Sequence, residues 1–349
     1  MTPPFQIGST EYDQTNVLVI AELSANHNGD YERTLRLIDE AVNAGADAIK
    51  VQTYTADSMT IRSENEEFMI SGGTSWDGKQ LHDVYAEGAM PWDWQPKLAE
   101  YCREKGVLFF STPFDFAAVD FLEEIGVPAY KVASFELTDI PLIERIGKTG
   151  KPIIISTGMG TVSEISDAVD AAKRSGSSSI AMLKCTSAYP ADPADANLAT
   201  IPQIAQTFKV SVGLSDHTMG VAVPVAAVAL GAVVIEKHFT LSRDDGGVDS
   251  AFSLEPKEFA SMVDAVRVAE KAIGEVDFGE SDGTDSLRRY RRSLYVVKPI
   301  KAGDEFTETN VRAIRPGLGL PPKYYSQVLG RVAASDLPEG TPLSWEMVS

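Results

Sequence analysis

The stretch VLVIAELSANHNGDYERTLRLIDEAVNAGADAIKVQTY, residues 17–54, decides the fold. It begins with an apolar strand, Val17–Leu23, that ends in polar residues. Asp30 can then cap a helix with one apolar face, and Gly45 ends that helix. A second apolar strand, Ala48–Tyr54, follows at once. This order predicts a β-α-β unit with parallel strands.

The same unit recurs along the first 275 residues. Each expected strand is apolar on both faces, as in a parallel sheet covered on both sides. The expected strands are Val17–Leu23, Ala48–Tyr54, Val107–Thr112, Ala129–Ser134, Pro152–Thr157, Ile180–Cys185, Val210–Leu214 and Val233–Phe239. Eight such units in about 260 residues predict a closed (β/α)₈ TIM barrel over residues 1–275. The alternative, an open doubly wound sheet, usually carries GxGxxG after its first strand, and ELSANH at 22–27 is unlike it.

Two segments depart from the repeat. Thr55–Pro91 is a long insertion rich in aromatic residues, which we interpret as an ordered lid. Residues 276–290 are polar and predict a linker. Beyond them, residues 291–349 alternate short apolar runs with Gly and Pro turns, which predicts a small β-rich domain. A domain of this size is marginal alone, so we expect it to dock on a partner surface.

Charge and composition exclude several classes of protein. With 31 Lys and Arg against 50 Asp and Glu, the formal charge is −19, which argues against nucleic-acid binding but not against an anionic small substrate. Two cysteines, Cys102 and Cys185, provide neither a disulfide framework nor a thiolate zinc site. Residues 1–15 lack the apolar core of an export signal, and the longest uncharged run, 219–235, is short for a membrane span. We therefore expect a cytoplasmic protein without membrane partners.

Two lysines, Lys50 and Lys131, lie inside apolar strands. A buried ammonium group needs an anionic partner. That partner is either a carboxylate on a neighbouring strand or a phosphate or carboxylate ligand. Serines at other strand ends, Ser134, Ser156 and Ser215, favour an anionic ligand. A Schiff-base lysine of an aldolase, at Lys131 or Lys237, is another use of the same chemistry.

Two of the four histidines, His217 and His238, end adjacent expected strands, and Glu22 ends the first one. In a TIM barrel, these carboxyl ends meet at one face. Two imidazoles with open positions for water and substrate oxygens suit Mn²⁺, Mg²⁺ or Co²⁺. Ordinary rim histidines are the alternative.

Taken together, the strand ends resemble those of the sialic acid (nonulosonic acid) synthase family. The matching segments span the barrel in order. They are residues 20–29 (IAELSANHNG), 48–53 (AIKVQT), 111–114 (STPF), 130–134 (YKVAS), 156–159 (STGM), 213–218 (GLSDHT) and 235–239 (IEKHF). The tail, with RPGLG at 315–319, is similar to the antifreeze-like (SAF) domain of these enzymes.

The resemblance implies a role for each matching residue. Phosphoenolpyruvate would be held by Lys50, Thr112, Lys131, Ser134, Ser156, Ser187 and Ser215. His217 and His238 would bind a divalent metal, and Glu22 would act beside them. Gln52, Tyr189 and Asp249 would contact the sugar. Arg315 would reach the acetamido group of a sugar held by the other protomer, which implies a domain-swapped homodimer.

Within the family, the chain resembles the pseudaminic acid branch. The segments GTSWDGK at 73–79, PWDW at 91–94 and GVDSAFSLEP at 247–256 fit that branch, whereas the N-acetylneuraminate branch has Asn in place of Ser187. This implies condensation of phosphoenolpyruvate with 2,4-diacetamido-2,4,6-trideoxy-L-altrose. Trp76, Phe68 and Met69 would either contact its apolar groups or pack the lid on the barrel.

Three alternatives stay open at this stage. An N-acetylneuraminate or legionaminate synthase would use the same machinery on another sugar. A Schiff-base aldolase would dispense with the metal. A non-catalytic protein could bind ice or carbohydrate through its tail. An ice-binding surface would need a flat array of regularly spaced residues such as Thr, which charged residues such as Arg291 and Arg315 fit poorly.

Overall fold

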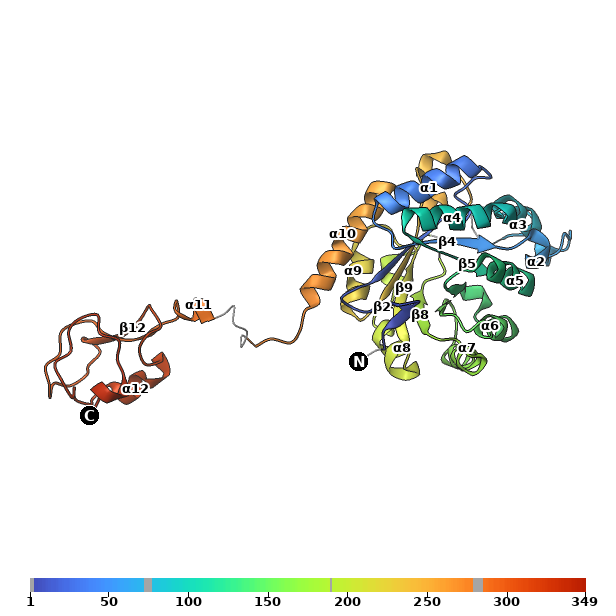
Figure 1. Cartoon of the computed structure of the whole chain (residues 1–349). Coiled ribbons are helices and arrows are strands. Elements are labelled where there is room, and N and C mark those ends of the chain that lie inside the picture. The colour runs from blue at the N-terminus through green and yellow to red at the C-terminus, as the bar shows by residue number, and fades with distance from the viewer. Residues whose placement is uncertain (1–2, 72–76, 189, 279–284) are drawn as a thin grey trace. The chain divides into compact units, whose positions relative to one another are not determined.

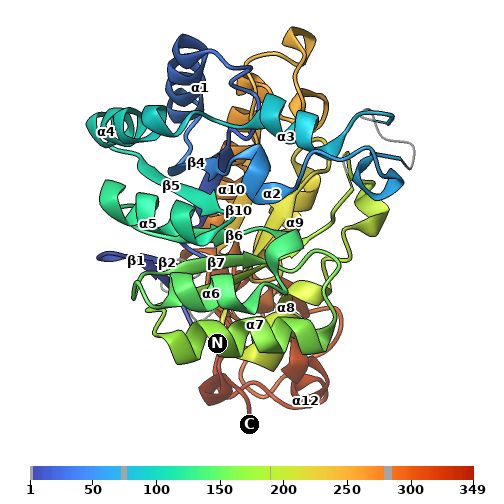
Figure 2. The same cartoon turned by 90° about the vertical axis from the view of Figure 1, so that its right-hand side faces the viewer.

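The computed structural model describes residues 3–71, 77–188, 190–278 and 285–349. Within these ranges, eight parallel strands close into a barrel in the order β10-β3-β4-β5-β6-β7-β8-β9. Helices surround the strands (Figures 1 and 2). The predicted TIM barrel is confirmed. The strands are β3 Leu18–Glu22, β4 Ala48–Thr53, β5 Leu108–Pro113, β6 Tyr130–Val132, β7 Ile153–Ser156, β8 Ile180–Cys185, β9 Ser211–Asp216 and β10 Val234–His238.

The helices between the strands begin and end where their caps require. Asp30 caps α1 (Tyr31–Asn43) by accepting a hydrogen bond from the backbone N–H of Arg33. A capping box of Thr161 and Glu164 starts α7 (Val162–Ser175). The other outer helices are α4 Gln95–Lys105, α5 Phe116–Ile125, α6 Ile140–Gly147, α8 Thr200–Phe208, α9 Ala222–Ala229 and α10 Pro256–Ile273. Their apolar faces and the strands share one continuous core.

A β-hairpin precedes the barrel, and sequence reasoning missed it. Strands β1 (Phe5–Ile7) and β2 (Thr10–Tyr12) pair antiparallel and bury Phe5 and Tyr12 in the barrel core. The hydroxyl group of Ser211, at the start of β9, donates to the carbonyl of Pro3 at 2.8 Å. The hairpin therefore lies at the amino ends of the strands, away from their carboxyl ends.

The insertion after β4 contains α2 (Ala56–Met59), the 3₁₀ turn η1 (Glu66–Phe68) and α3 (Leu81–Gly88). It ends at η2 (Trp92–Trp94), where the Trp92 ring packs on Phe121 at 4.9 Å. Phe68 and Met69 are half-buried, whereas Trp76 lies outside the described residues. The insertion is thus attached beside the carboxyl end of β4.

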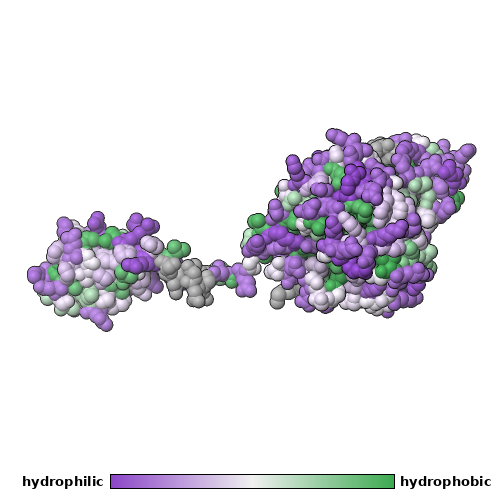
Figure 3. Space-filling view, turned by 45° about the horizontal axis from the view of Figure 1, so that its top comes forward, coloured by the Kyte–Doolittle hydropathy of each residue, from purple (hydrophilic) through white to green (hydrophobic). Residues whose placement is uncertain are grey.

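The chain divides into two compact units, residues 1–274 and 275–349. The second unit contains α11 Asp285–Arg288, β11 Ser293–Val296, β12 Val311–Ile314, η8 Pro322–Tyr324, α12 Tyr325–Val328 and η9 Trp345–Met347. Strands β11 and β12 pair antiparallel over a small core that includes Phe306 and Leu343. The face drawn in Figure 3 is mostly hydrophilic on both units. None of the helices in the described ranges has the length and apolarity to cross a membrane.

Candidate active site

The carboxyl ends of the strands bring charged side chains to one end of the barrel. The register places Glu22 of β3 beside Lys50 of β4 on one side and His238 of β10 on the other. Glu236 of β10 lies beside Ser215 of β9. Because the strands are parallel, these pairs lie at similar depth along the barrel axis.

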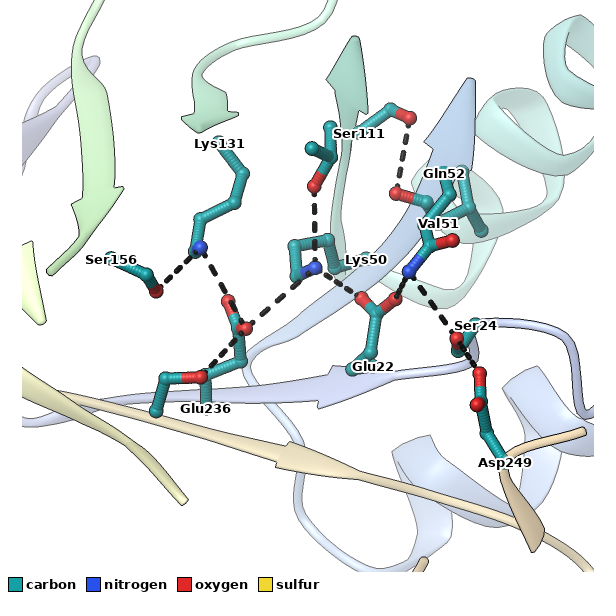
Figure 4. A network of polar contacts seen from close by, with 12 residues as sticks. Glu22, Ser24, Lys50, Val51, Gln52, Ser111, Lys131, Ser156, Glu236 and Asp249 are labelled. Atoms are coloured by element: carbon teal, nitrogen blue, oxygen red, sulfur yellow. Dashed lines mark hydrogen bonds and ion pairs between the residues drawn. The ribbon is translucent and has the colours of Figure 1, made fainter. Parts of the chain in front are cut away.

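Two carboxylates and two ammonium groups form a buried network (Figure 4). Lys50 Nζ lies 2.5 Å from Glu22 Oε2 and 3.7 Å from Glu236 Oε1. Lys131 Nζ lies 4.0 Å from the same Glu236 oxygen. All four side chains are at most 6% exposed. Each lysine therefore has a carboxylate partner, the first alternative that the sequence left open, and the formal charges of the two carboxylates and two ammonium groups cancel.

Hydroxyl groups surround the network. Lys131 Nζ donates to Ser156 Oγ at 2.7 Å, and Lys50 Nζ donates to Thr112 Oγ1 at 3.3 Å. Ser215 Oγ donates to Glu236 Oε1 at 3.3 Å. The combination of two ammonium groups and several hydroxyl groups is suited to hold a compact oxyanion.

Two more serines, Ser134 and Ser187, approach each other across Gly158. A Cβ atom on Gly158 would lie 2.7 Å from Ser134 Oγ and 3.0 Å from Ser187 Oγ. Only glycine therefore leaves room for both hydroxyl groups there, and its φ of +40° is strained for other residues. The buried Ser134 hydroxyl group also lies beside the Cys185 thiol, whose pKa it helps to lower.

Burial and neighbouring charges shift the pKa values of the network. Burial, with the charge of Glu236, raises the pKa of Glu22 to about 7 against the opposing effect of Lys50. Burial also lowers the pKa of Lys131, although Glu236 counteracts it. The two carboxylates raise the pKa of Lys50, outweighing its burial. Shifts of this kind in one cluster are typical of functional sites.

The two imidazoles of His217 and His238 lie side by side, with ring centroids 5.2 Å apart. Phe252 packs edge-on against His238 at 5.0 Å. His217 Nδ1 lies 2.9 Å from the carbonyl oxygen of Thr186, whereas the buried His238 Nδ1 has no hydrogen-bond partner in the described part of the chain. Burial and nearby positive charges hold the pKa of His238 well below its usual range, so its imidazole is neutral at pH 7.

These imidazoles fit a divalent metal with few protein ligands. The described residues contain no group of three or more His, Cys, Asp or Glu side chains arranged to hold a metal ion. A dication at His217 and His238 would therefore take its other ligands from water or substrate, which is the arrangement of an open site. The unpartnered His238 nitrogen is the observation that favours it.

A polar chain leads outward from the network. Gln52 Nε2 donates to Glu22 Oε1 and to Ser24 Oγ, both at 3.2 Å. The Ser24 hydroxyl group donates in turn to the half-buried carboxylate of Asp249 (Figure 4). Burial raises the pKa of Asp249. This series of hydrogen bonds connects Glu22 to Gln52 and Asp249, both of which are expected to contact a sugar.

The structure brings most of the predicted site residues to one end of the barrel. Those that lie there are Glu22, Lys50, Gln52, Thr112, Lys131, Ser134, Ser156, Ser187, Ser215, His217, His238 and Asp249. Tyr189 lies outside the described residues. Arg315 belongs to the second compact unit, directly after β12.

Sequence reasoning assigned no role to three groups at this end. Glu236 is the shared partner of both lysines. Burial raises the pKa of Glu136 to about 7 against the charge of Lys131. Although burial raises the pKa of Cys185, a hydrogen bond to His217 and the charge of that imidazole lower it to about 7. Glu236 could have been found, because it lies two residues before His238 and therefore on the same face of the strand.

A second buried ion pair lies on the opposite face of β9 and β10. Lys237 Nζ lies 2.5 Å from Asp216 Oδ2 and also donates to the carbonyl of Thr218. Lys237 is fully buried. Its ammonium group is thus engaged by Asp216 and Thr218 on the face away from the site, which disfavours Lys237 as a Schiff-base nucleophile.

Comparison with known proteins agrees with this geometry. The model of the NeuB family matches residues 37–278, and the SAF domain matches residues 291–349. The chain belongs to the NeuB family. It is 45% identical over 338 residues to the pseudaminic acid synthase of Campylobacter jejuni, covering 97% of this chain and 98% of that one.

Two further similarities cover most of the chain. The pseudaminic acid synthase of Helicobacter pylori is 42% identical over 327 residues, covering 93% of this chain and 96% of that protein. Among solved structures, the N-acetylneuraminic acid synthetase of Leptospira borgpetersenii in complex with citrate aligns with a TM-score of 0.73 at 34% identity. That alignment covers 82% of this chain and 95% of the other. The resemblance to the sialic acid synthase family is confirmed.

Proposed function

We propose that this protein condenses phosphoenolpyruvate with 2,4-diacetamido-2,4,6-trideoxy-L-altrose to give pseudaminic acid and phosphate. The observation that carries the proposal is the cluster of two buried lysines and two imidazoles at the carboxyl end of a NeuB-family barrel. The similarity to two pseudaminic acid synthases over nearly the full chain supports the choice of sugar. The alternative function is synthesis of N-acetylneuraminate or legionaminate.

In this proposal, Lys50 and Lys131 hold the phosphate and carboxylate groups of phosphoenolpyruvate. Thr112, Ser156 and Ser215, each bonded to a member of the network, add hydroxyl contacts, together with Ser134 and Ser187. The bound anion then takes the place of Glu236 as partner of the ammonium groups. The Glu236 carboxylate lies about 4 Å from both lysine nitrogens, which is a loose pairing that a closer anion can replace. Holding the enol close to the sugar converts a bimolecular step into a local one.

The chemistry forms one C–C bond and breaks one C–O bond. C3 of phosphoenolpyruvate attacks the aldehyde of the open-chain sugar, and positive charge develops at C2. Glu22, which as a carboxylate contacts Lys50 at 2.5 Å, stabilises that charge and positions the water that adds to C2. Loss of phosphate from C2 then leaves the keto group of the product.

A divalent metal completes the proposed site. Held by His217 and His238, Mn²⁺, Mg²⁺ or Co²⁺ would supply Lewis-acid polarisation of the sugar carbonyl. Gln52 and Asp249, linked through Ser24, orient the sugar. We further propose that Tyr189 contacts the sugar, that 276–290 is a linker, and that Arg315 acts across a domain-swapped homodimer.

The test is phosphate release from phosphoenolpyruvate with each candidate aldehyde sugar, with and without added Mn²⁺. We expect release with the diacetamido sugar and none after chelation. Glu22→Gln should abolish release while the variant still binds phosphoenolpyruvate in calorimetry. Glu124→Gln, at an exposed position on α5, is the matched control. Near-normal release by Glu22→Gln removes Glu22 from the mechanism, and borohydride trapping of a lysine adduct would favour an aldolase.

A further inference from the structure

Three side chains on one face of β4 and its end, those of Lys50, Gln52 and Tyr54, form a row that extends outward from the site. Lys50 pairs with Glu22, and Gln52 donates to Glu22 and Ser24. Tyr54 is the next residue with the same alternation, immediately after β4 ends at Thr53. Because a strand advances about 6.6 Å in two residues, Tyr54 lies one layer farther out than Gln52.

The Tyr54 side chain is almost fully buried, with 5% of its surface exposed. No hydrogen bond to its hydroxyl group is found among the described residues, where its backbone carbonyl accepts from Trp92 Nε1 at 3.1 Å. Unlike His238 Nδ1, this oxygen is not sealed from solvent, so it is open to a bound ligand.

The surroundings indicate which way this hydroxyl group faces. A Cβ atom on Gly88 would lie 2.9 Å from Tyr54 Oη and 3.4 Å from Ala25 Cβ, and the Ala25 N–H donates to Asp249 Oδ2 at 3.4 Å. The hydroxyl group therefore lies toward the Asp249 side of the site. Burial, with the charges of Asp249, Tyr85 and Glu22, raises the pKa of Tyr54, so the phenol stays protonated at neutral pH and is available as a donor.

The ring of Tyr54 belongs to an aromatic cluster. Phe114, after β5, packs edge-on against it at 5.3 Å, and Tyr85 of α3 does so at 5.9 Å. Tyr85 and Gly88 both come from the insertion, so the insertion completes this wall. An aromatic wall that carries phenol donors matches an acetamido group, which combines a methyl group with a carbonyl acceptor.

We propose that Tyr54 determines sugar specificity by donating a hydrogen bond to an acetamido carbonyl, while Phe114 and Tyr85 contact the acetamido methyl group. This inference rests on the proposed function, because it concerns the sugar side of the same site. It assigns the insertion a role in recognising an amide-bearing sugar through Tyr85 and Gly88 of α3.

The test is Tyr54→Phe, which removes the hydroxyl group and keeps the ring contacts. We expect the KM for the diacetamido sugar to rise about tenfold, as for one hydrogen bond, with kcat within about twofold and phosphoenolpyruvate binding unchanged. Tyr101→Phe is the matched control, because its hydroxyl group bonds to Asp39 at 2.8 Å on the outer helices. If the wild-type protein releases no phosphate with this sugar, the proposed function fails. If it does and Tyr54→Phe leaves KM unchanged, only the inference about Tyr54 fails.

A double variant separates the hydroxyl group from general packing. Gly88→Ala forces its new methyl group against Tyr54 Oη, so it should raise the sugar KM in the wild-type background. In the Tyr54→Phe background the contact is absent, and Gly88→Ala should add little. Equal effects of Gly88→Ala in both backgrounds would show that the helix position, not the hydroxyl group, controls KM, and would overturn the inference.

Discussion

Glu236→Gln tests the central network most directly. The variant keeps the shape of the side chain and an oxygen for Ser215, but removes the negative charge that Lys50 and Lys131 share. One buried positive charge is then left in excess. We expect the ligand-free protein to lose stability and to regain it when an anion binds.

The magnitude follows from the distances. A unit charge pair at about 4 Å is worth about 4 kcal/mol at an effective dielectric constant near 20, and Glu236 Oε1 lies 3.7 Å from Lys50 Nζ and 4.0 Å from Lys131 Nζ. Part of this gain offsets the cost of burying the carboxylate. Removing one partner of a buried ion pair costs about 3–5 kcal/mol. For a unit of 274 residues, that corresponds to a fall in Tm of roughly 10 °C.

The loss should depend on pH. Burial lowers the pKa of Lys131 in the folded protein, and removing Glu236 lowers it further. Between this lowered pKa and the ordinary lysine value of 10.5, the folded protein binds fewer protons than the unfolded chain. Stability therefore rises with pH through this window, and the deficit of Glu236→Gln should shrink as the pH is raised.

The assay is thermal unfolding with and without inorganic phosphate. Phosphate should raise the Tm of Glu236→Gln more than that of the wild-type protein, because it restores the missing charge. Glu87→Gln is the control, since Glu87 pairs with Lys79 at 3.3 Å on the surface and should cost less than about 1 kcal/mol. Equal melting temperatures of Glu236→Gln and wild type, or equal shifts with phosphate, would refute the reasoning.

The other predictions concern charge, pH and metal. Lys237→Met leaves Asp216 buried without its cation, so we expect a loss of about 3–5 kcal/mol in urea unfolding. Adding Asp216→Asn should recover most of it, and an additive double variant would contradict the pairing. Because burial raises the pKa of Glu22 to about 7, kcat/KM should fall as the pH drops below about 7; a flat profile there would mean that the carboxylate form is not required. His238→Ala should weaken Mn²⁺ binding, measured by electron paramagnetic resonance on the stripped protein, by more than about 100-fold, and unchanged binding would exclude His238 as a ligand.

Much of the barrel could be predicted because its signal is local. Each strand is a short run that is apolar on both faces, and the helix between β3 and β4 carries its own cap at Asp30. The hairpin of β1 and β2 was missed because three-residue strands show too little alternation to distinguish them from a loop. Phe5 and Tyr12 are buried only because they pack on the barrel, and the hairpin sequence alone does not show that contact.

The site could be predicted as far as topology determines it. A closed parallel barrel gathers every strand end, so Glu22, Lys50 and Lys131 had to converge. The bond between Ser24 and Asp249, 225 residues apart, depends on the paths of two loops, which no local pattern specifies. The position of the Tyr54 hydroxyl group likewise becomes evident only when the insertion is in place.

The barrel closes where β10 pairs with β3, and the candidate site crosses that seam. Glu22 is contributed near the start of the unit and His238 more than 200 positions later, yet they are neighbours in the register. A ribosome must therefore have delivered β10 before any of the proposed chemistry is possible. A truncated chain that ends before β10 would have no catalytic activity. A circularly permuted chain with new termini elsewhere would have to keep the pairing of β3 with β10 to remain active.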